Sequence, residues 1–293
     1  MNSDYSIAPL GSAGVIVTRR SSIGLTALPR EQITRLFREH GLVLWRGFAP
    51  SPSDFAALAA QFTESYFLGY GRVPFPELRT IALANETNLP LEAHCDNGIR
   101  PEPQRPDITW FFCETPAETA GETTIFDGVA VWATLSEDTQ KLLTERRISY
   151  LTHFAEQVYT QMGYADPVAF DRFVQTLGGT VKSRHADRSI DVELLSSALG
   201  RTRHLGQPAF VSSLCLAGSR GFESLRVELE GGLPIPEPVL TEIRAALTAC
   251  GDLIRWQAGD VAMLDNTRFL HGRRGFSDMR RRLYLIQTLR ANF

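Results

Sequence analysis

Short apolar segments separated by glycine, proline or polar turns recur along this 293-residue chain. The clearest are residues 42–46, 78–84, 108–113, 123–126, 148–151, 253–256, 261–265 and 283–289. Runs of this length, rich in β-branched and aromatic residues and ended by turns, are typical of strands rather than helices. Many short strands with helices between them predict a mainly β fold with flanking helices, namely a double-stranded β-helix (jelly-roll) barrel.

Helical spacing of apolar residues is limited to a few segments. Residues 29–40 place Ile33, Leu36 and Phe37 on one face, and a second helix begins near Ser53, which we expect to cap it. Ser136 is expected to cap a helix that runs to about Glu145. Another helix follows the prolines near 234–236 and ends near position 251.

The length suits a single domain over residues 1–293. Between about 153 and 222 the apolar pattern weakens and polar residues increase. We interpret this stretch as an insertion, or lid, that covers the mouth of the barrel. Asn85 and Glu86 lie in a loop of the kind that carries substrate contacts, although a plain turn role explains them equally well.

The composition excludes several classes of protein. The formal net charge of -3 provides no basic field for a nucleic-acid backbone, and no apolar run is long enough to span a membrane. The four cysteines show neither zinc-knuckle nor disulfide-framework spacing, and the first residues lack a secretion signal. We therefore expect a cytoplasmic protein with a small-molecule substrate; oligomerisation is left open.

One apolar stretch ends in His94-Cys95-Asp96, and a distant one leads to His271. Residues two apart on an extended strand point to the same side, so His94 and Asp96 can reach one ion. His271 offers a second imidazole. Two histidines and one carboxylate on one side of a metal are diagnostic of non-haem Fe(II) oxygenases. A second His-x-Asp triplet, His185-Ala186-Asp187, lies in a polar run without an apolar strand before it, and we interpret it as a surface loop.

Further motifs surround the first triplet in a fixed order. The chain contains HCD, then GET at 121–123, then GDVAMLDNTRFLH ending at His271, then an arginine that opens the apolar strand LYLIQTL. With the N-terminal HGLVLWRGF, this order resembles that of the taurine dioxygenase (TauD/TfdA) family of Fe(II)/2-oxoglutarate-dependent oxygenases. The resemblance covers most of the chain outside residues 145–250.

The resemblance implies a set of cofactors and residue roles. His94, Asp96 and His271 would hold Fe(II), which leaves positions for the cosubstrate 2-oxoglutarate and for dioxygen. The distal carboxylate of 2-oxoglutarate would meet Thr123 and the guanidinium of Arg282, with Arg280 as the runner-up because it has the same strand parity. A buried carboxylate needs such a charged, hydrogen-bonding partner.

The reaction implied is oxidation of an unactivated C–H bond, with 2-oxoglutarate converted to succinate and CO2. Hydroxylation is expected first, while desaturation, epoxidation or cyclisation would use the same ligands. Related halogenases lack the carboxylate that Asp96 provides here, so halogenation is not expected. The family's taurine enzyme holds the sulfonate with an arginine four residues after the cosubstrate arginine, where this chain has Ile286. An alkylsulfonate substrate is therefore not expected. The range of the family suggests instead a small polar, amino-acid-derived metabolite of a biosynthetic pathway.

Two other classes of function use the same residues. A zinc hydrolase could employ His94, Asp96 and His271 with a bound water, but it would give Thr123 and Arg282 no role. A jelly-roll binding module without catalysis would use these polar residues only for packing. Succinate release with Fe(II) and dioxygen distinguishes the oxygenase from both.

Overall fold

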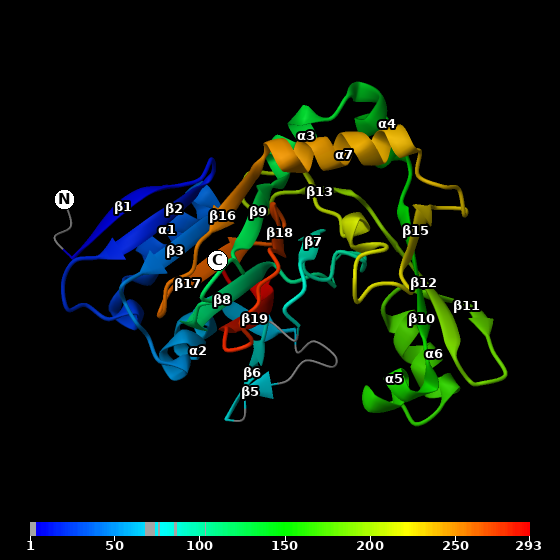
Figure 1. Cartoon of the computed structure of the whole chain (residues 1–293), viewed down its shortest axis with the longest axis horizontal. Coiled ribbons are helices and arrows are strands. Elements are labelled where there is room, and N and C mark those ends of the chain that lie inside the picture. Colours follow the sequence, from blue (N-terminus) through cyan, green and yellow to red (C-terminus); the bar gives the residue numbers. More distant parts are fainter. Residues whose placement is uncertain (1–3, 68–73, 76, 85–86, 103) are drawn as a thin grey trace.

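A computed structural model describes residues 4–67, 74–75, 77–84, 87–102 and 104–293 of the chain. Figure 1 shows a β-rich body, with β1 to β3 at one end of the long axis and a separate lobe of strands and helices at the other. Helix α7 (Glu237–Ala249) lies along one side of the molecule next to α3 and α4 (Figure 1).

Two sheets form the barrel, as expected for a jelly roll. The larger sheet contains, in spatial order, β1 (Tyr5–Leu10), β2 (Gly14–Arg19), β3 (Leu42–Arg46), β17 (Val261–Asp265), β8 (Ile108–Thr115), β19 (Arg282–Ala291), β6 (Leu78–Leu83) and β5 (Pro74–Phe75), and β4 (Thr63–Tyr66) also pairs with β19. The smaller sheet contains, in spatial order, β16 (Gly251–Ile254), β9 (Thr123–Asp127), β18 (Phe269–Arg273) and β7 (Leu91–His94). The predicted mainly β architecture is confirmed.

The larger sheet is buried on both faces, and its central strands are apolar at nearly every position. On β8, Trp110 packs into the cluster that includes Phe55 of α2 and Ile33 of α1. Its neighbour Phe111 packs on the opposite face, in the cluster that includes Ile125 of the smaller sheet. Strands covered on both sides lose the alternation of polar and apolar residues that marks a half-exposed strand. Sequence alone therefore cannot tell which residues of such a strand face the barrel interior.

The region predicted as an insertion has a structure of its own. A third sheet has the spatial order β11 (Thr180–Arg184), β12 (Ile190–Ser196), β10 (Ile148–Phe154) and β15 (Arg226–Leu229). Because β10 and β15 are paired, the lobe extends beyond the predicted bounds of 153–222 on both sides. The remaining elements between them are α5 (Glu156–Gln161), α6 (Pro167–Thr176), β13 (Leu199–Arg201), β14 (Pro208–Phe210) and the 3-10 turn η2 (Leu214–Leu216).

The four helices predicted from the sequence are present, with one cap misplaced, whereas α3, α5 and α6 were not predicted. The remaining helical elements are η1 (Leu25–Ala27), α1 (Arg30–His40), α2 (Pro52–Ala60), α3 (Gly128–Thr134) and α4 (Glu137–Glu145). Ser136 caps α4, as expected, by accepting a hydrogen bond from the Thr139 amide. The predicted cap at Ser53 is wrong, because Ser51 and Asp54 form the capping box and Pro52 takes the first helical position. Within the described residues, no helix combines the length and the apolar character needed to cross a membrane.

Candidate active site

The three predicted metal ligands lie together. His94 ends β7 and is the direct cross-strand partner of His271 on β18, and their ring centroids are 4.5 Å apart. Asp96 is buried two residues beyond the end of β7, with Oδ1 4.0 Å from Nε2 of His271. One potential ligand atom from each residue lies within 4.8 Å of the other two. Two neutral imidazoles and one carboxylate arranged in this way suit Fe(II).

Hydrogen bonds orient two of the three ligands. Nδ1 of His94 lies 2.9 Å from the carbonyl oxygen of Glu92, which can only accept, so Nδ1 carries the proton and Nε2 is the nitrogen left to bind a metal. The Thr109 hydroxyl donates to Oδ2 of Asp96 at 2.6 Å, while Oδ1 is the oxygen nearer His271. Thr109 was missed from the sequence because it lies in the apolar strand β8, with no motif around it.

Asn266 fixes the backbone at Asp96. Its side-chain oxygen accepts a 2.8 Å hydrogen bond from the Asp96 amide, and its Nδ2 donates to the carbonyl oxygens of Asp96 and Pro106 at 3.0 and 2.9 Å. The side chain is buried, and three hydrogen bonds hold it in one orientation. Asn266 could have been noticed in the sequence, since it belongs to the DN of the motif before His271. Its role as a positioning residue for Asp96 became visible only in three dimensions.

The lobe region contacts the same loop. Ser213 donates a 3.0 Å hydrogen bond to the carbonyl oxygen of Cys95, between the two ligands. The buried Arg105 guanidinium donates to the carbonyl oxygens of Gly98 and Val211, both at 3.0 Å. Cys95 itself packs against Val211 and Ala209, and it is not among the residues that line the metal cavity. The backbone that carries Asp96 is thus tied to the segment that follows β14.

Arg282, the predicted cosubstrate arginine, is not among the residues that line the cavity of the three ligands. Arg282 is exposed and donates to the carbonyl oxygen of Met279 at 2.9 Å, and Arg280 is exposed and pairs with Asp278 and Glu118. Arg281 is instead buried at 1% exposure and lines the cavity of the three ligands, together with Leu283 and Leu285. Side chains alternate along this segment as expected. However, Arg281, Leu283 and Leu285 face the barrel interior, whereas Tyr284 and Ile286 face the other side of the sheet. Ile286, four residues after Arg282, therefore packs in the core between the larger sheet and helices α1 and α2. Counted from Arg281 instead, the residue four positions later is Leu285, which is also apolar.

Two arginines make this cavity electropositive. Burial, together with the nearby positive charge of Arg273, lowers the pKa of Arg281 to about 10. Burial also lowers the pKa of Arg273, whose side chain donates to the carbonyl oxygen of Leu89 at 2.7 Å. Both guanidinium carbons lie 5.2 to 5.4 Å from the Phe276 ring centroid. A carboxylate bound here would offset the cost of burying the two positive charges.

Thr123 lines the same cavity and is buried. The indole Nε1 of Trp256 donates to its hydroxyl oxygen at 2.9 Å. An indole nitrogen can only donate, so the hydroxyl of Thr123 accepts from Trp256 and keeps its own proton for another acceptor. Thr123 therefore lies in the cavity of the three predicted ligands, and its partner Trp256 was missed from the sequence.

Two charged motif residues have a structural role. Arg46, from the N-terminal LVLWRGF, donates to Asp260, the acid of the later GD pair, with Nη2 2.7 Å from Oδ2. Asp260 is fully buried and also accepts from the Gln257 amide. This pair joins β3 to the turn before β17, so part of the sequence resemblance reflects the scaffold.

The second His-x-Asp triplet lies outside this cavity. His185 and Asp187 are exposed in a turn of the lobe, as expected, and Asp187 accepts from Ser189. Asn85 and Glu86 fall outside the described residues.

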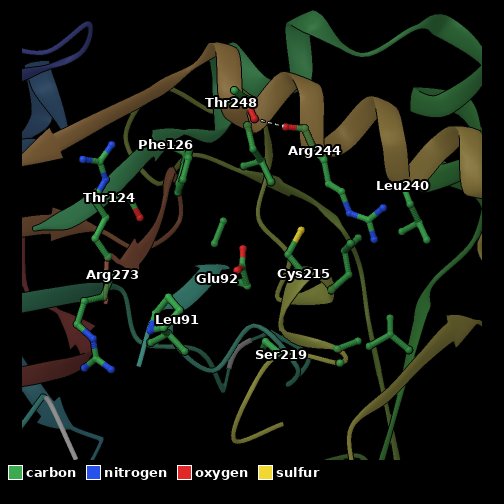
Figure 2. Close-up of a pocket in the computed structure, with 18 of the residues that line it drawn as sticks. Leu91, Glu92, Thr124, Phe126, Cys215, Ser219, Leu240, Arg244, Thr248 and Arg273 are labelled. Carbon is green, nitrogen blue, oxygen red and sulfur yellow. Dashed lines mark hydrogen bonds between the residues drawn. The ribbon is translucent and has the colours of Figure 1, made fainter. Parts of the chain in front are cut away.

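A larger chamber of about 820 Å³ adjoins the metal cavity and shares Leu91 and Arg273 with its wall. Figure 2 shows Arg273 and Arg244 on opposite sides of this chamber, with Glu92 and Cys215 between them. Apolar side chains from η2, β15 and α7 complete the wall, among them Leu214, Val227 and Leu240. The chamber combines both signs of charge with an apolar surface.

Comparison with known proteins gives consistent results. The family model described as taurine catabolism dioxygenase TauD, TfdA family, matches residues 6–288. The dapdiamide synthesis protein DdaC of Enterobacter agglomerans is 24% identical over 321 aligned positions, covering 96% of this chain and 93% of that protein.

Solved structures share the fold. PvcB of Pseudomonas aeruginosa superposes with a TM-score of 0.63 at 17% identity, covering 98% of this chain and 92% of that one. A second PvcB structure, described as an Fe, alpha-ketoglutarate dependent oxygenase from an isonitrile synthetic pathway, gives 0.62 at 17% identity and the same coverage. A taurine dioxygenase from Burkholderia xenovorans gives 0.65 at 15% identity, covering 99% and 90%.

Proposed function

This chain belongs to the TauD/TfdA family of Fe(II)/2-oxoglutarate-dependent dioxygenases, and we propose that it oxidises a C–H bond of a small polar, amino-acid-derived metabolite. Hydroxylation is the proposed outcome; desaturation, epoxidation or cyclisation would use the same ligands. The observation that carries the proposal is the convergence of His94, Asp96 and His271 beside the buried guanidinium of Arg281.

Each residue has a proposed task. Nε2 of His94, Oδ1 of Asp96 and an imidazole nitrogen of His271 would hold Fe(II). Arg281 would pair with the distal carboxylate of 2-oxoglutarate, and Thr123 would donate its hydroxyl proton to the same group. When bound, Fe(II), 2-oxoglutarate and dioxygen supply the oxidising chemistry, which yields succinate, CO2 and the oxidised substrate. The protein binds and orients the substrate and prevents competing reactions.

The proposed substrate class is supported by the chamber beside β7. Glu92 can pair with an ammonium group, while Arg244 and Arg273 can meet a carboxylate (Figure 2). Leu285, at the position where the taurine enzyme has its sulfonate-binding arginine, supports the exclusion of alkylsulfonates. The relatives named for dapdiamide synthesis and for an isonitrile pathway are consistent with a biosynthetic role.

We further propose that the lobe forms the lid of a single catalytic domain. Ser213 and Arg105 connect the lobe region to the loop that carries Asp96, and η2 forms part of the chamber wall. All four cysteines are free, which supports the reducing cytoplasm as the proposed compartment.

Succinate release tests the function. Metal-free protein is supplied with Fe(II), dioxygen and 2-oxoglutarate, with a mixture of amino-acid-derived metabolites as candidate substrates. We expect succinate in step with a metabolite that gains one oxygen atom or loses two hydrogens by mass spectrometry. His271→Ala abolishes both, whereas His40→Ala, on the surface helix α1, retains both. Turnover with Zn²⁺ in place of Fe(II), without succinate, would instead indicate the hydrolase. If the protein showed no Fe(II)-dependent binding of 2-oxoglutarate, the result would favour the alternative of a jelly-roll binding module without catalysis.

A further inference from the structure

A second cluster of metal-binding side chains lies on the sheet of the lobe. His153 on β10 and Asp191 on β12 are direct cross-strand partners, and His185 follows the end of β11. Nδ1 of His153 lies 2.8 Å from Oδ1 of Asp191, and Nε2 of His185 lies 2.8 Å from Oδ2. One ligand atom from each residue lies within 4.8 Å of the other two. The described residues thus contain a second set of two histidines and one carboxylate.

The charged neighbours of this cluster already have partners of their own. Arg184 pairs with Asp171, and Arg188 pairs with Glu156 at 2.9 Å. Within the part of the chain that the structure describes, the carboxylate of Asp191 contacts the two imidazoles.

We propose that His153, His185 and Asp191 bind a transition-metal dication such as Zn²⁺ at a site distinct from the catalytic one. Imidazole and carboxylate ligands suit Zn²⁺, Co²⁺ or Ni²⁺, whereas Mg²⁺ and Ca²⁺ prefer oxygen ligands alone. The imidazoles are 45% and 43% exposed, so an ion can enter from solvent without opening the fold, and water can complete its coordination.

The geometry needs only small side-chain movements. Tetrahedral coordination with bonds of roughly 2.0–2.1 Å separates ligand atoms by about 3.3 Å. The two nitrogen-to-oxygen distances of 2.8 Å would lengthen slightly, and the two imidazole nitrogens lie within 4.8 Å before any adjustment. The three residues lie near the same end of their strands, where the side chains of His153 and His185 are exposed to solvent.

A bound ion would cross-link three segments of the lobe, namely β10, β12 and the turn after β11. It would stabilise the lobe because binding occurs only when these segments are folded together.

Metal stoichiometry tests the proposal on the full-length, tag-free protein after treatment with a chelator. Equilibrium dialysis against Zn²⁺ is expected to give two ions per chain for the unmodified protein. His153→Ala and His185→Ala should each bind one ion, as should the catalytic-site variant His271→Ala. The double variant His153→Ala/His271→Ala should bind none, and the matched surface control His40→Ala should bind two. Circular dichroism confirms that each variant is folded.

A second measurement identifies the site by its ligands. On the His271→Ala background, Co²⁺ should give the intense visible bands of a four-coordinate ion, and Asp191→Asn should remove them. Zn²⁺ should also raise the Tm of His271→Ala but not of His153→Ala/His271→Ala. The proposal is overturned by one ion per chain in the unmodified protein that is lost in His271→Ala, or by two ions retained in both His153→Ala and His185→Ala. Either result would mean that the cluster is a hydrogen-bonded link without metal.

Discussion

The hydroxyl of Thr109 donates a 2.6 Å hydrogen bond to Oδ2 of Asp96, inside a strand that the sequence marks only as apolar. This contact selects which carboxylate oxygen faces the metal position. Partners of metal ligands commonly change metal affinity by about 10- to 100-fold when removed.

Thr109→Val keeps the shape of the side chain and removes its donor. We expect affinity for Mn²⁺, used as a redox-stable substitute for Fe(II), to fall by about 10- to 100-fold. Electron paramagnetic resonance titration measures this directly. Thr288→Val is the matched control, because Thr288 is equally buried but accepts from Trp110 instead of contacting the ligands. Equal losses of affinity in the two variants would show that Asp96 does not depend on Thr109.

Arg281 and Arg282 are adjacent, but we expect opposite results from their replacement. Removing one partner of a buried charge pair costs about 2–5 kcal/mol, so Arg281→Gln should raise the 2-oxoglutarate concentration needed for half-saturation by at least about 30-fold. Arg282→Gln should leave it within about twofold, because that side chain is exposed. The visible charge-transfer band of the Fe(II) complex, followed without dioxygen, reports the titration. A large effect in Arg282→Gln alone would reverse the assignment.

The hydrogen bond from Trp256 to Thr123 predicts a graded effect on cosubstrate binding. A hydrogen bond to a charged group is worth about 1.5–3 kcal/mol, so Thr123→Val should weaken 2-oxoglutarate binding by about 10- to 100-fold. Trp256→Phe should weaken 2-oxoglutarate binding only a few-fold, because the Thr123 hydroxyl remains and loses only the hydrogen bond that orients it. In the double variant the two effects should not add. Trp45→Phe, in the outer core, is the control, and additive effects would mean that the two residues act separately.

His204 predicts sensitivity to acid. Burial beside the Phe37 and Phe293 rings, together with the nearby positive charges of Arg203 and Arg38, lowers its pKa from 6.5 to about 4. The unfolded chain therefore takes up a proton below about pH 6.5 that the folded chain takes up only near pH 4. The free energy of unfolding should consequently fall as the pH drops through this window, by about 1 kcal/mol once solvent screening of this half-exposed group is included.

The test is denaturant unfolding of His204→Phe at several pH values between 7 and 4. The variant should lose about 1 kcal/mol less stability over this range than the unmodified protein, because it carries no titrating group at this position. His40→Gln, which changes a histidine on the surface of α1, should follow the unmodified protein. An unchanged pH dependence in His204→Phe would show that other groups cause the acid sensitivity.

Much of the site could be predicted from local sequence. His94 and Asp96 are two residues apart, and a strand end brings such residues to one side whatever surrounds them. Thr123 and His271 were found through motifs whose order matches the family. Thr109, Trp256 and Arg105 were not found, because their roles depend on which distant backbone or side chain lies against them.

The sequence by itself determined the types of ligand, the mainly β architecture and the succession of strands that brings the two histidines together. Only the tertiary structure decided which of three consecutive arginines enters the cavity. The physical reason is that β19 is covered by a core on each face, with Ile286 packed on one side and Leu285 on the other. Hydrophobicity is then equal on both faces, and the direction of a side chain is settled by the packing of the sheets.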